Sequence, residues 1–158
     1  MTATAHALVA GAIATKFTDP QTAAALAFFS HFVMDSIPHW DVGTNWRERT
    51  RSKTGAFAIA ETAIGILVAV ALFSSRAPMA TLLVAIVFAL LPDWLEVPYY
   101  VFFARQNKEK PAKTAGFWEK LTYGIYKTEN FFHTKAEYPL GVITQVVTVL
   151  FFFFLLAR

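Results

Sequence analysis

The stretch SHFVMDSIPHWD, residues 30–41, closes an otherwise apolar segment with four side chains able to bind a metal ion: His31, Asp35, His39 and Asp41. On a helix, His31 and Asp35 are four residues apart and share one face, with His39 one turn further on. Ionisable groups inside an apolar helix are costly and are usually kept for function. The plainer interpretation is a neutral histidine that is hydrogen-bonded to Asp35 within a packed core. The other polar residues of the chain decide between these two interpretations.

The composition indicates a membrane protein. The chain has 158 residues, of which 56% are hydrophobic and 16 are Phe, and its mean hydropathy is +0.44. This is too apolar for a soluble domain of the same size. The absence of cysteine excludes disulfides, thiolate metal sites and cysteine nucleophiles. The net charge of +3 is typical of the Lys and Arg that orient membrane proteins, so we predict no nucleic-acid partner.

The apolar segments predict an all-α integral membrane protein, with a single transmembrane domain over residues 1–158. Asp19 and Pro20 are typical of the start of a helix, and Pro38 ends that helix. Pro92 removes one backbone hydrogen bond, so a kink or break is expected there. The predicted bundle has about five transmembrane helices, at residues 3–16, 20–37, 55–73, 78–104 and 137–157, and an amphipathic interfacial helix at residues 116–132.

The first predicted helix is short for a membrane span. Residues 3–16 reach only about 21 Å, so they cross a thin region of bilayer or lie partly buried among the other helices. Small residues recur at every fourth position of this helix, which allows a neighbouring helix to approach closely. These residues are Ala3, Ala7, Gly11 and Thr15.

The basic loops predict the orientation of the chain. The segments 42–53 and 105–136 lie on one side if five helices span, which gives a multi-pass protein of the cell (inner) membrane with a cytoplasmic N-terminus. In this topology every histidine and every carboxylate of the apolar spans falls near the cytoplasmic side. We therefore predict that the four histidines are neighbours in space.

Histidine and carboxylate ligands without cysteine favour Zn²⁺, with Mn²⁺ or Fe²⁺ as alternatives, and the number of ligands leaves a pair of ions open. Glu61 or Glu96 would be the general base. The alternative is a metal-free polar cluster that only fixes helix packing. The predicted metal ligands are His6, His31, Asp35, His39, Asp41, Asp93 and His133.

Two local patterns carry a resemblance to known proteins. The opening HALVAG, residues 6–11, and the element LPD, residues 91–93, resemble the membrane-bound metal-dependent hydrolase family of the bacterial inner membrane. That resemblance implies ligand roles for His6 and Asp93. The segment from His31 to His39 is similar to the His-x-x-x-Asp segment of zinc-dependent phospholipase C, which implies zinc ligands at His31 and Asp35. The chain lacks the His-Arg-Gly-x-Thr-His-Ser element of the membrane family.

These observations predict a metal-dependent hydrolase that cleaves a phosphoester or other ester of a lipid or lipid-linked substrate at the cytoplasmic leaflet. Water activated by the metal would be the nucleophile, and the basic loops would recruit an anionic headgroup. The alternative function is a transporter or channel for divalent metal ions or protons. A conduction path needs polar groups through the whole membrane, and the outer halves of the predicted helices have almost none. The substrate and a homo-oligomeric state stay open.

Overall fold

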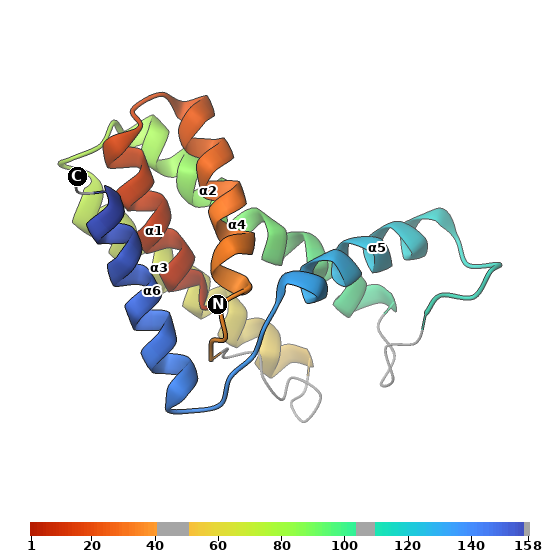
Figure 1. Cartoon of the computed structure of the whole chain (residues 1–158). Helices are drawn as coiled ribbons and strands as arrows, with labels where there is room; N and C mark the ends of the chain where they lie inside the picture. Colours follow the sequence, from red (N-terminus) through yellow and green to blue (C-terminus); the bar gives the residue numbers. More distant parts are fainter. Residues whose placement is uncertain (41–50, 104–109, 157–158) are drawn as a thin grey trace.

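The computed structural model describes residues 1–40, 51–103 and 110–156. Within these ranges the chain is helical and contains no strand, which confirms the predicted all-α class. Helix boundaries fall within a few residues of those predicted. The elements in Figure 1 are α1 (Ala3–Lys16), α2 (Pro20–Asp35), α3 (Arg51–Phe73), α4 (Met79–Pro98), the π-helical turn η2 (Tyr99–Phe103), α5 (Phe117–Phe132) and α6 (Leu140–Leu156).

Helix α1 lies at the centre of the bundle, in contact with α2, α3, α4 and α6 (Figure 1). Most of its residues are buried among these neighbours, which is one of the two arrangements predicted for this helix. Small residues make the close packing possible: a Cβ added to Gly65 of α3 would lie 2.8 Å from the Cα of Thr4. A Cβ on Gly11 would likewise collide with the ring of Phe73.

Helix α2 begins and ends where its sequence predicts. The Asp19 carboxylate accepts a hydrogen bond from the Thr22 N–H at 2.8 Å, and this bond lowers the pKa of Asp19 below its ordinary value. Pro20 occupies the first helical position. Asp35 is the last residue of α2, three residues before Pro38.

The predicted interruption at Pro92 does not end the helix. Helix α4 continues through Pro92 to Pro98. A proline removes only one hydrogen bond of the helical ladder, and Pro92 is fully buried in a helix that packs along α2 and α1. Packing on both neighbours therefore outweighs the missing bond.

Within the described ranges, two helical segments are long and apolar enough to cross a membrane: Gly55–Phe73 and Met79–Phe103. The remaining apolar helices are shorter, with 14 residues in α1, 16 in α2 and 17 in α6. The prediction of about five transmembrane helices is therefore not confirmed. Helix α3 turns apolar side chains outward, with Leu67 at 69% exposure.

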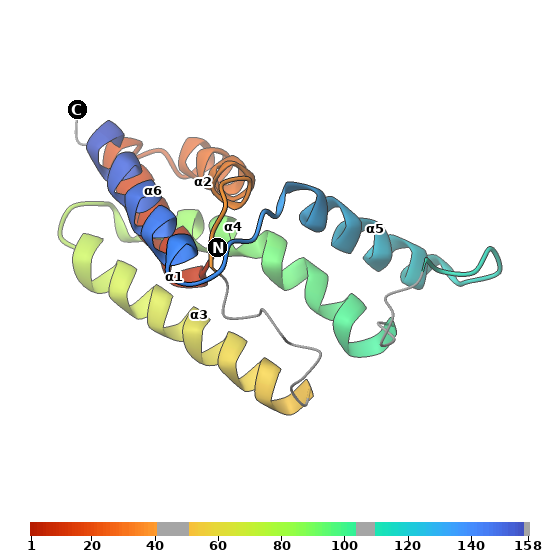
Figure 2. The same ribbon diagram turned by 60° about the horizontal axis from the view of Figure 1, so that its bottom comes forward.

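Helix α5 lies along the second half of α4 and extends away from the bundle (Figures 1 and 2). It confirms the predicted amphipathic helix. Thr122 and Glu129 are buried, whereas Phe117 and Trp118 are 69% and 68% exposed. The buried side of α5 thus carries polar residues toward the bundle, and Phe117 and Trp118 at its start are exposed.

The segments that follow α2 and α5 pair through their backbones. Thr134 N–H donates to the Asp35 carbonyl at 2.9 Å, and His39 N–H donates to the Thr134 carbonyl at 3.1 Å. Gly141, at the start of α6, lies directly against this pair, because a Cβ there would collide with the Trp40 backbone nitrogen and lie 2.5 Å from the Ala136 carbonyl oxygen. This pairing brings together two chain segments that are far apart in sequence.

Candidate metal centre

All four histidines of the chain gather around the carboxylate of Asp35. Four different segments supply them: His6 from the first half of α1, His31 from the end of α2, His39 from the segment after α2, and His133 from the residue after α5. His6, His31, Asp35 and His39 are at most 2% exposed. The predicted proximity of the four histidines is therefore confirmed.

The first ligand group consists of His6, His31 and Asp93, whose potential ligand atoms lie within 4.8 Å of one another. The rings of His6 and His31 are stacked, with centroids 4.2 Å apart. The Nε2 atom of His31 is 3.8 Å from Oδ1 of Asp93. Helices α1, α2 and α4 thus each contribute one side chain to this group.

The second ligand group consists of Asp35, His39 and His133, which meet the same distance limit. The Nε2 atoms of His39 and His133 are 3.0 Å apart. The Asp35 carboxylate lies 3.6 Å from Nδ1 of His133 and 3.9 Å from Nε2 of His39. The backbone pairing described above holds both histidines of this group in place.

Backbone carbonyls orient one histidine in each group. Nδ1 of His31 lies 2.8 Å from the Ala89 carbonyl oxygen, and Nδ1 of His39 lies 2.8 Å from the Ile37 carbonyl oxygen. A carbonyl only accepts, so each Nδ1 carries the proton and donates it. The lone pair of the neutral ring is then on Nε2, which faces the cluster, as in most histidine ligands of metals.

Three buried polar atoms of the cluster residues make no hydrogen bond within the described residues: Nδ1 of His6, Nε2 of His31 and Oδ2 of Asp35. The Nε2 of His31 and Oδ2 of Asp35 are 3.5 Å apart. Oδ1 of Asp35 does have partners, the backbone nitrogen of Met1 and Nε2 of His6. A buried polar atom without a partner costs free energy, and a divalent cation would bind nitrogen and carboxylate atoms of this kind.

Sequence reasoning missed Glu129. This residue of α5 is 7% exposed, and its Oε2 lies 3.5 Å from Nε2 of His31. A signal was available, because Glu129 precedes His133 by four residues, the same spacing that joins His31 to Asp35. The amphipathic pattern of this segment predicts an interfacial helix and assigns its acidic residue no role in the site.

Two predicted site residues lie elsewhere. The carboxylate of Glu61 accepts hydrogen bonds from the backbone N–H groups of Ala3 and Thr4, both at 2.8 Å. It therefore caps the first turn of α1, whose amides lack helical partners. Glu96 accepts a bond of 3.4 Å from Asn130 on α5. Neither glutamate belongs to the two ligand groups, and Asp41 lies outside the described residues.

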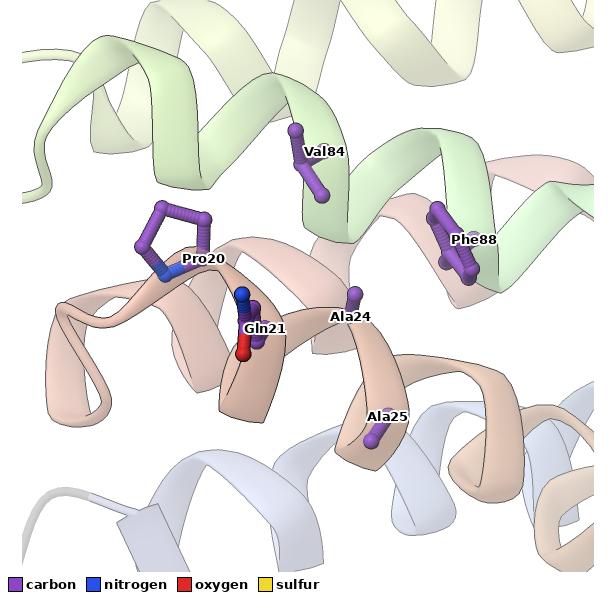
Figure 3. A pocket seen from close by; sticks show the side chains of 6 residues that line it. All are labelled: Pro20, Gln21, Ala24, Ala25, Val84 and Phe88. Carbon is purple, nitrogen blue, oxygen red and sulfur yellow. The ribbon is translucent and has the colours of Figure 1, made fainter.

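An apolar pocket of about 370 Å³ opens between α2 and α4 (Figure 3). Pro20, Gln21, Ala24 and Ala25 line it from α2, and Val84 and Phe88 line it from α4. It lies along the first half of α2, whereas His31 and Asp35 are at the end of that helix. The pocket offers no group for chemistry and is separate from the ligand cluster.

Fold and site together define an all-helical protein with a buried histidine and carboxylate cluster able to hold a metal ion. Comparison of the chain with protein-family models, curated proteins and solved structures gives no match. The chemistry of the cluster is therefore the ground for any functional assignment.

Proposed function

We propose that the protein is a metal-dependent hydrolase that cleaves a phosphoester or other ester of a lipid or lipid-linked substrate. The observation that carries this proposal is the set of buried atoms on His6, His31 and Asp35 that make no hydrogen bond within the described residues. Core packing alone gives no reason to bury such atoms on three neighbouring side chains. The resemblance to membrane-bound and phospholipase hydrolases supports the same reaction class.

A lipid substrate is supported by the surroundings of the cluster. Glu129 and His133 connect it directly to α5, the helix whose exposed Phe117 and Trp118 suit the headgroup layer of a membrane. The exposed lysines Lys120 and Lys127 on the same helix would attract anionic headgroups. In this proposal the cluster opens at the cytoplasmic leaflet of a multi-pass inner-membrane protein, with its N-terminus on that side.

The ligand groups around Asp35 would hold a divalent cation, which would supply an acidified water and a stabilising charge. The protein's own part is to position the substrate and to move a proton. Glu129 is the carboxylate best placed to take a proton from the attacking water, because it is buried beside His31. It replaces Glu61 and Glu96 in this role.

The test is hydrolysis by the full-length protein reconstituted in phosphatidylcholine vesicles that contain phosphatidic acid or phosphatidylglycerol, with Zn²⁺ or Mn²⁺ added. We expect release of phosphate or headgroup that stops when a chelator is added. Glu129→Gln should lower the turnover at least about 100-fold, since general acid–base catalysis contributes 10²–10⁴-fold. Glu119→Gln, on the same helix, is the matched control and should leave turnover unchanged.

Ion flux separates the hydrolase from a transporter. The same vesicles, loaded with a fluorescent metal indicator or a pH indicator, report entry of divalent ions or protons. Hydrolysis without flux supports the proposal. Flux that depends on Asp35 and His31, without release of phosphate or headgroup, would replace it with the transporter.

A further inference from the structure

We propose that the apolar pocket between α2 and α4 binds the acyl chain of a phospholipid whose headgroup lies at the ligand cluster. This inference rests on the proposed function, because it assigns a place to the tail of the same lipid substrate. Except for Gln21, at the end remote from the cluster, the lining side chains are apolar (Figure 3). The pocket volume of about 370 Å³ lies within the range of ligand pockets, about 300–1,000 Å³.

The pocket and the cluster lie along the same two helices, α2 and α4, which pack against each other. On α2, His31 follows the lining residue Ala25 by six residues, a rise of about 9 Å. On α4, the lining residue Phe88 directly precedes Ala89, whose carbonyl oxygen lies 2.8 Å from Nδ1 of His31. The pocket therefore ends within about two helical turns of the cluster.

Phenylalanine side chains fill the interval between the pocket and the cluster. Phe28 and Phe32 continue the face of α2 that carries Ala25, at steps of three and four residues. The ring centroids of Phe28 and Phe32 are 5.3 Å apart, and those of Phe32 and Phe132 are 5.4 Å apart. Phe132 immediately precedes His133. These three rings, the phenylalanine track, lead from the pocket to the cluster.

The cluster is accessible on the side where the phenylalanine track reaches it. The side chains of His6, His31 and His39 are fully buried, whereas those of Asp93 and His133 are 40% and 18% exposed. A headgroup would therefore enter beside Asp93 and His133. The chain attached to that headgroup would then meet the phenylalanine track first and the pocket next.

The direction of the track suits a lipid in a bilayer. In the proposed topology the end of α2 lies near the cytoplasmic headgroups, and the first half of this helix lies deeper in the hydrocarbon layer. A lipid with its headgroup at the cluster then extends its tail toward the pocket. Burial of the tail against apolar side chains contributes roughly 0.8 kcal/mol per methylene when the chain leaves water, but inside a bilayer the gain comes from close packing.

An acyl chain suits the pocket better than a further helix does. Close packing of a helix in a membrane needs small residues at four-residue intervals on the surface that it covers. The exposed side chains beside the pocket are large: Phe29 on α2, and Leu83 and Val87 on α4. They would hold a helix away from Ala25, whereas a single hydrocarbon chain is narrow enough to pass between them.

The experiment uses the full-length protein in phosphatidylcholine vesicles that contain phosphatidic acid with a diazirine midway along one acyl chain. Irradiation attaches the chain to the residues that it contacts, and mass spectrometry of the digest identifies them. We expect cross-links at the pocket, above all at Val84 and Phe88. Cross-links that are absent from the pocket, or equally frequent on the exposed sides of α3 and α6, would overturn the inference, because they would report bulk lipid only.

A variant tests whether the pocket itself holds the chain. Ala25→Phe places a ring in the pocket and should lower cross-linking at Val84 and Phe88 at least about tenfold, the effect of withdrawing about two methylenes from apolar contact. Ala25 is exposed, so the core is not overpacked. The matched control, Ala71→Phe on the exposed side of α3, should leave this cross-linking unchanged. Equal cross-linking in the two variants would contradict the assignment.

A second probe keeps the test valid if Ala25→Phe does not fold. Phosphatidic acid with the diazirine at the start of the acyl chain should label Phe32 and Phe132 of the wild-type protein instead of the pocket. The same labelled residues with both probes would show that the chain does not lie along the phenylalanine track, and would refute the inference.

The outcome is distinguishable from that of the proposed function. Cross-links that move along the track with the probe, in a protein that releases no phosphate or headgroup from vesicles, would keep the acyl-chain site and refute the hydrolase. Hydrolysis by a protein whose cross-links are spread evenly over its exposed helices would refute the acyl-chain site and keep the hydrolase.

Discussion

The Nε2 atoms of His39 and His133 lie 3.0 Å apart, although 94 residues separate the two histidines in the chain. Backbone hydrogen bonds between the segments that follow α2 and α5 hold this pair, through His39 and Thr134 on one side and through Ala136 and His39 on the other. The backbone therefore positions this pair of histidines, and their proximity does not depend on the two side chains alone.

His133→Ala should weaken metal binding at least about 100-fold. Loss of a residue that merely supports a ligand costs 10–100-fold in affinity, so loss of a ligand should reach or exceed the upper end of that range. The backbone pairing does not involve the His133 ring, and the fold should persist. Competition with a chelator of known affinity measures the change, and an unaltered affinity would remove His133 from the site.

Gly141→Ala should displace the backbone segment that carries His39. The new Cβ would collide with the backbone of Trp40 and Ala136, and such overpacking costs about 1–3 kcal/mol. Displacement of the His39 segment should also lower metal affinity. Denaturant unfolding in detergent and a metal titration check both effects.

The control for Gly141→Ala is Gly124→Ala in α5, where an added Cβ has no neighbour within 4 Å. That change should stabilise the protein by about 0.5–1 kcal/mol, because alanine is the better helix former. Equal effects of the two substitutions would show that Gly141 is not a close-packed position.

Glu61→Gln should lower stability and leave metal binding intact. Its carboxylate accepts bonds from the first amides of α1, and loss of such a charged cap costs about 1 kcal/mol. Denaturant unfolding measures the loss, and metal analysis of the same variant supplies the comparison. A variant of normal stability without metal would return Glu61 to the site and contradict its assignment as a cap.

The sequence predicts the helices better than it predicts the site. The limits of α2 follow from local chemistry, because the residues that set them lie at or near its ends: Asp19, Pro20 and Pro38. The four histidines could be predicted to meet because the predicted topology puts each of them near the same side of the membrane. Whether the helix breaks at Pro92 could not be read from local sequence, since packing against α2 and α1 decides whether the helix continues.

The carboxylates show the limit of sequence reasoning most clearly. Glu61 and Glu129 are both acidic residues in helices, and only the tertiary contacts separate them. Glu61 accepts hydrogen bonds from the first amides of α1, whereas Glu129 lies beside His31 of α2. The identity of a long-range partner is not encoded in local spacing, although the four-residue step from Glu129 to His133 was a usable sign.

Trp118 tests the membrane placement of α5. We expect its fluorescence to be quenched more by lipids brominated near the headgroup than by lipids brominated deep in the acyl chains, because it is exposed on an amphipathic helix. The chain has four tryptophans, so the measurement uses a variant that keeps Trp118 alone. Quenching by neither lipid would put α5 in water.

The most direct measurement of the central claim is the metal content of the purified full-length protein, compared with that of His31→Ala. The account predicts at least one tightly held divalent ion per wild-type chain and its loss in His31→Ala, with helicity by circular dichroism unchanged. A folded wild-type protein that holds no divalent ion after purification, and takes up none when Zn²⁺ or Mn²⁺ is added, would contradict it.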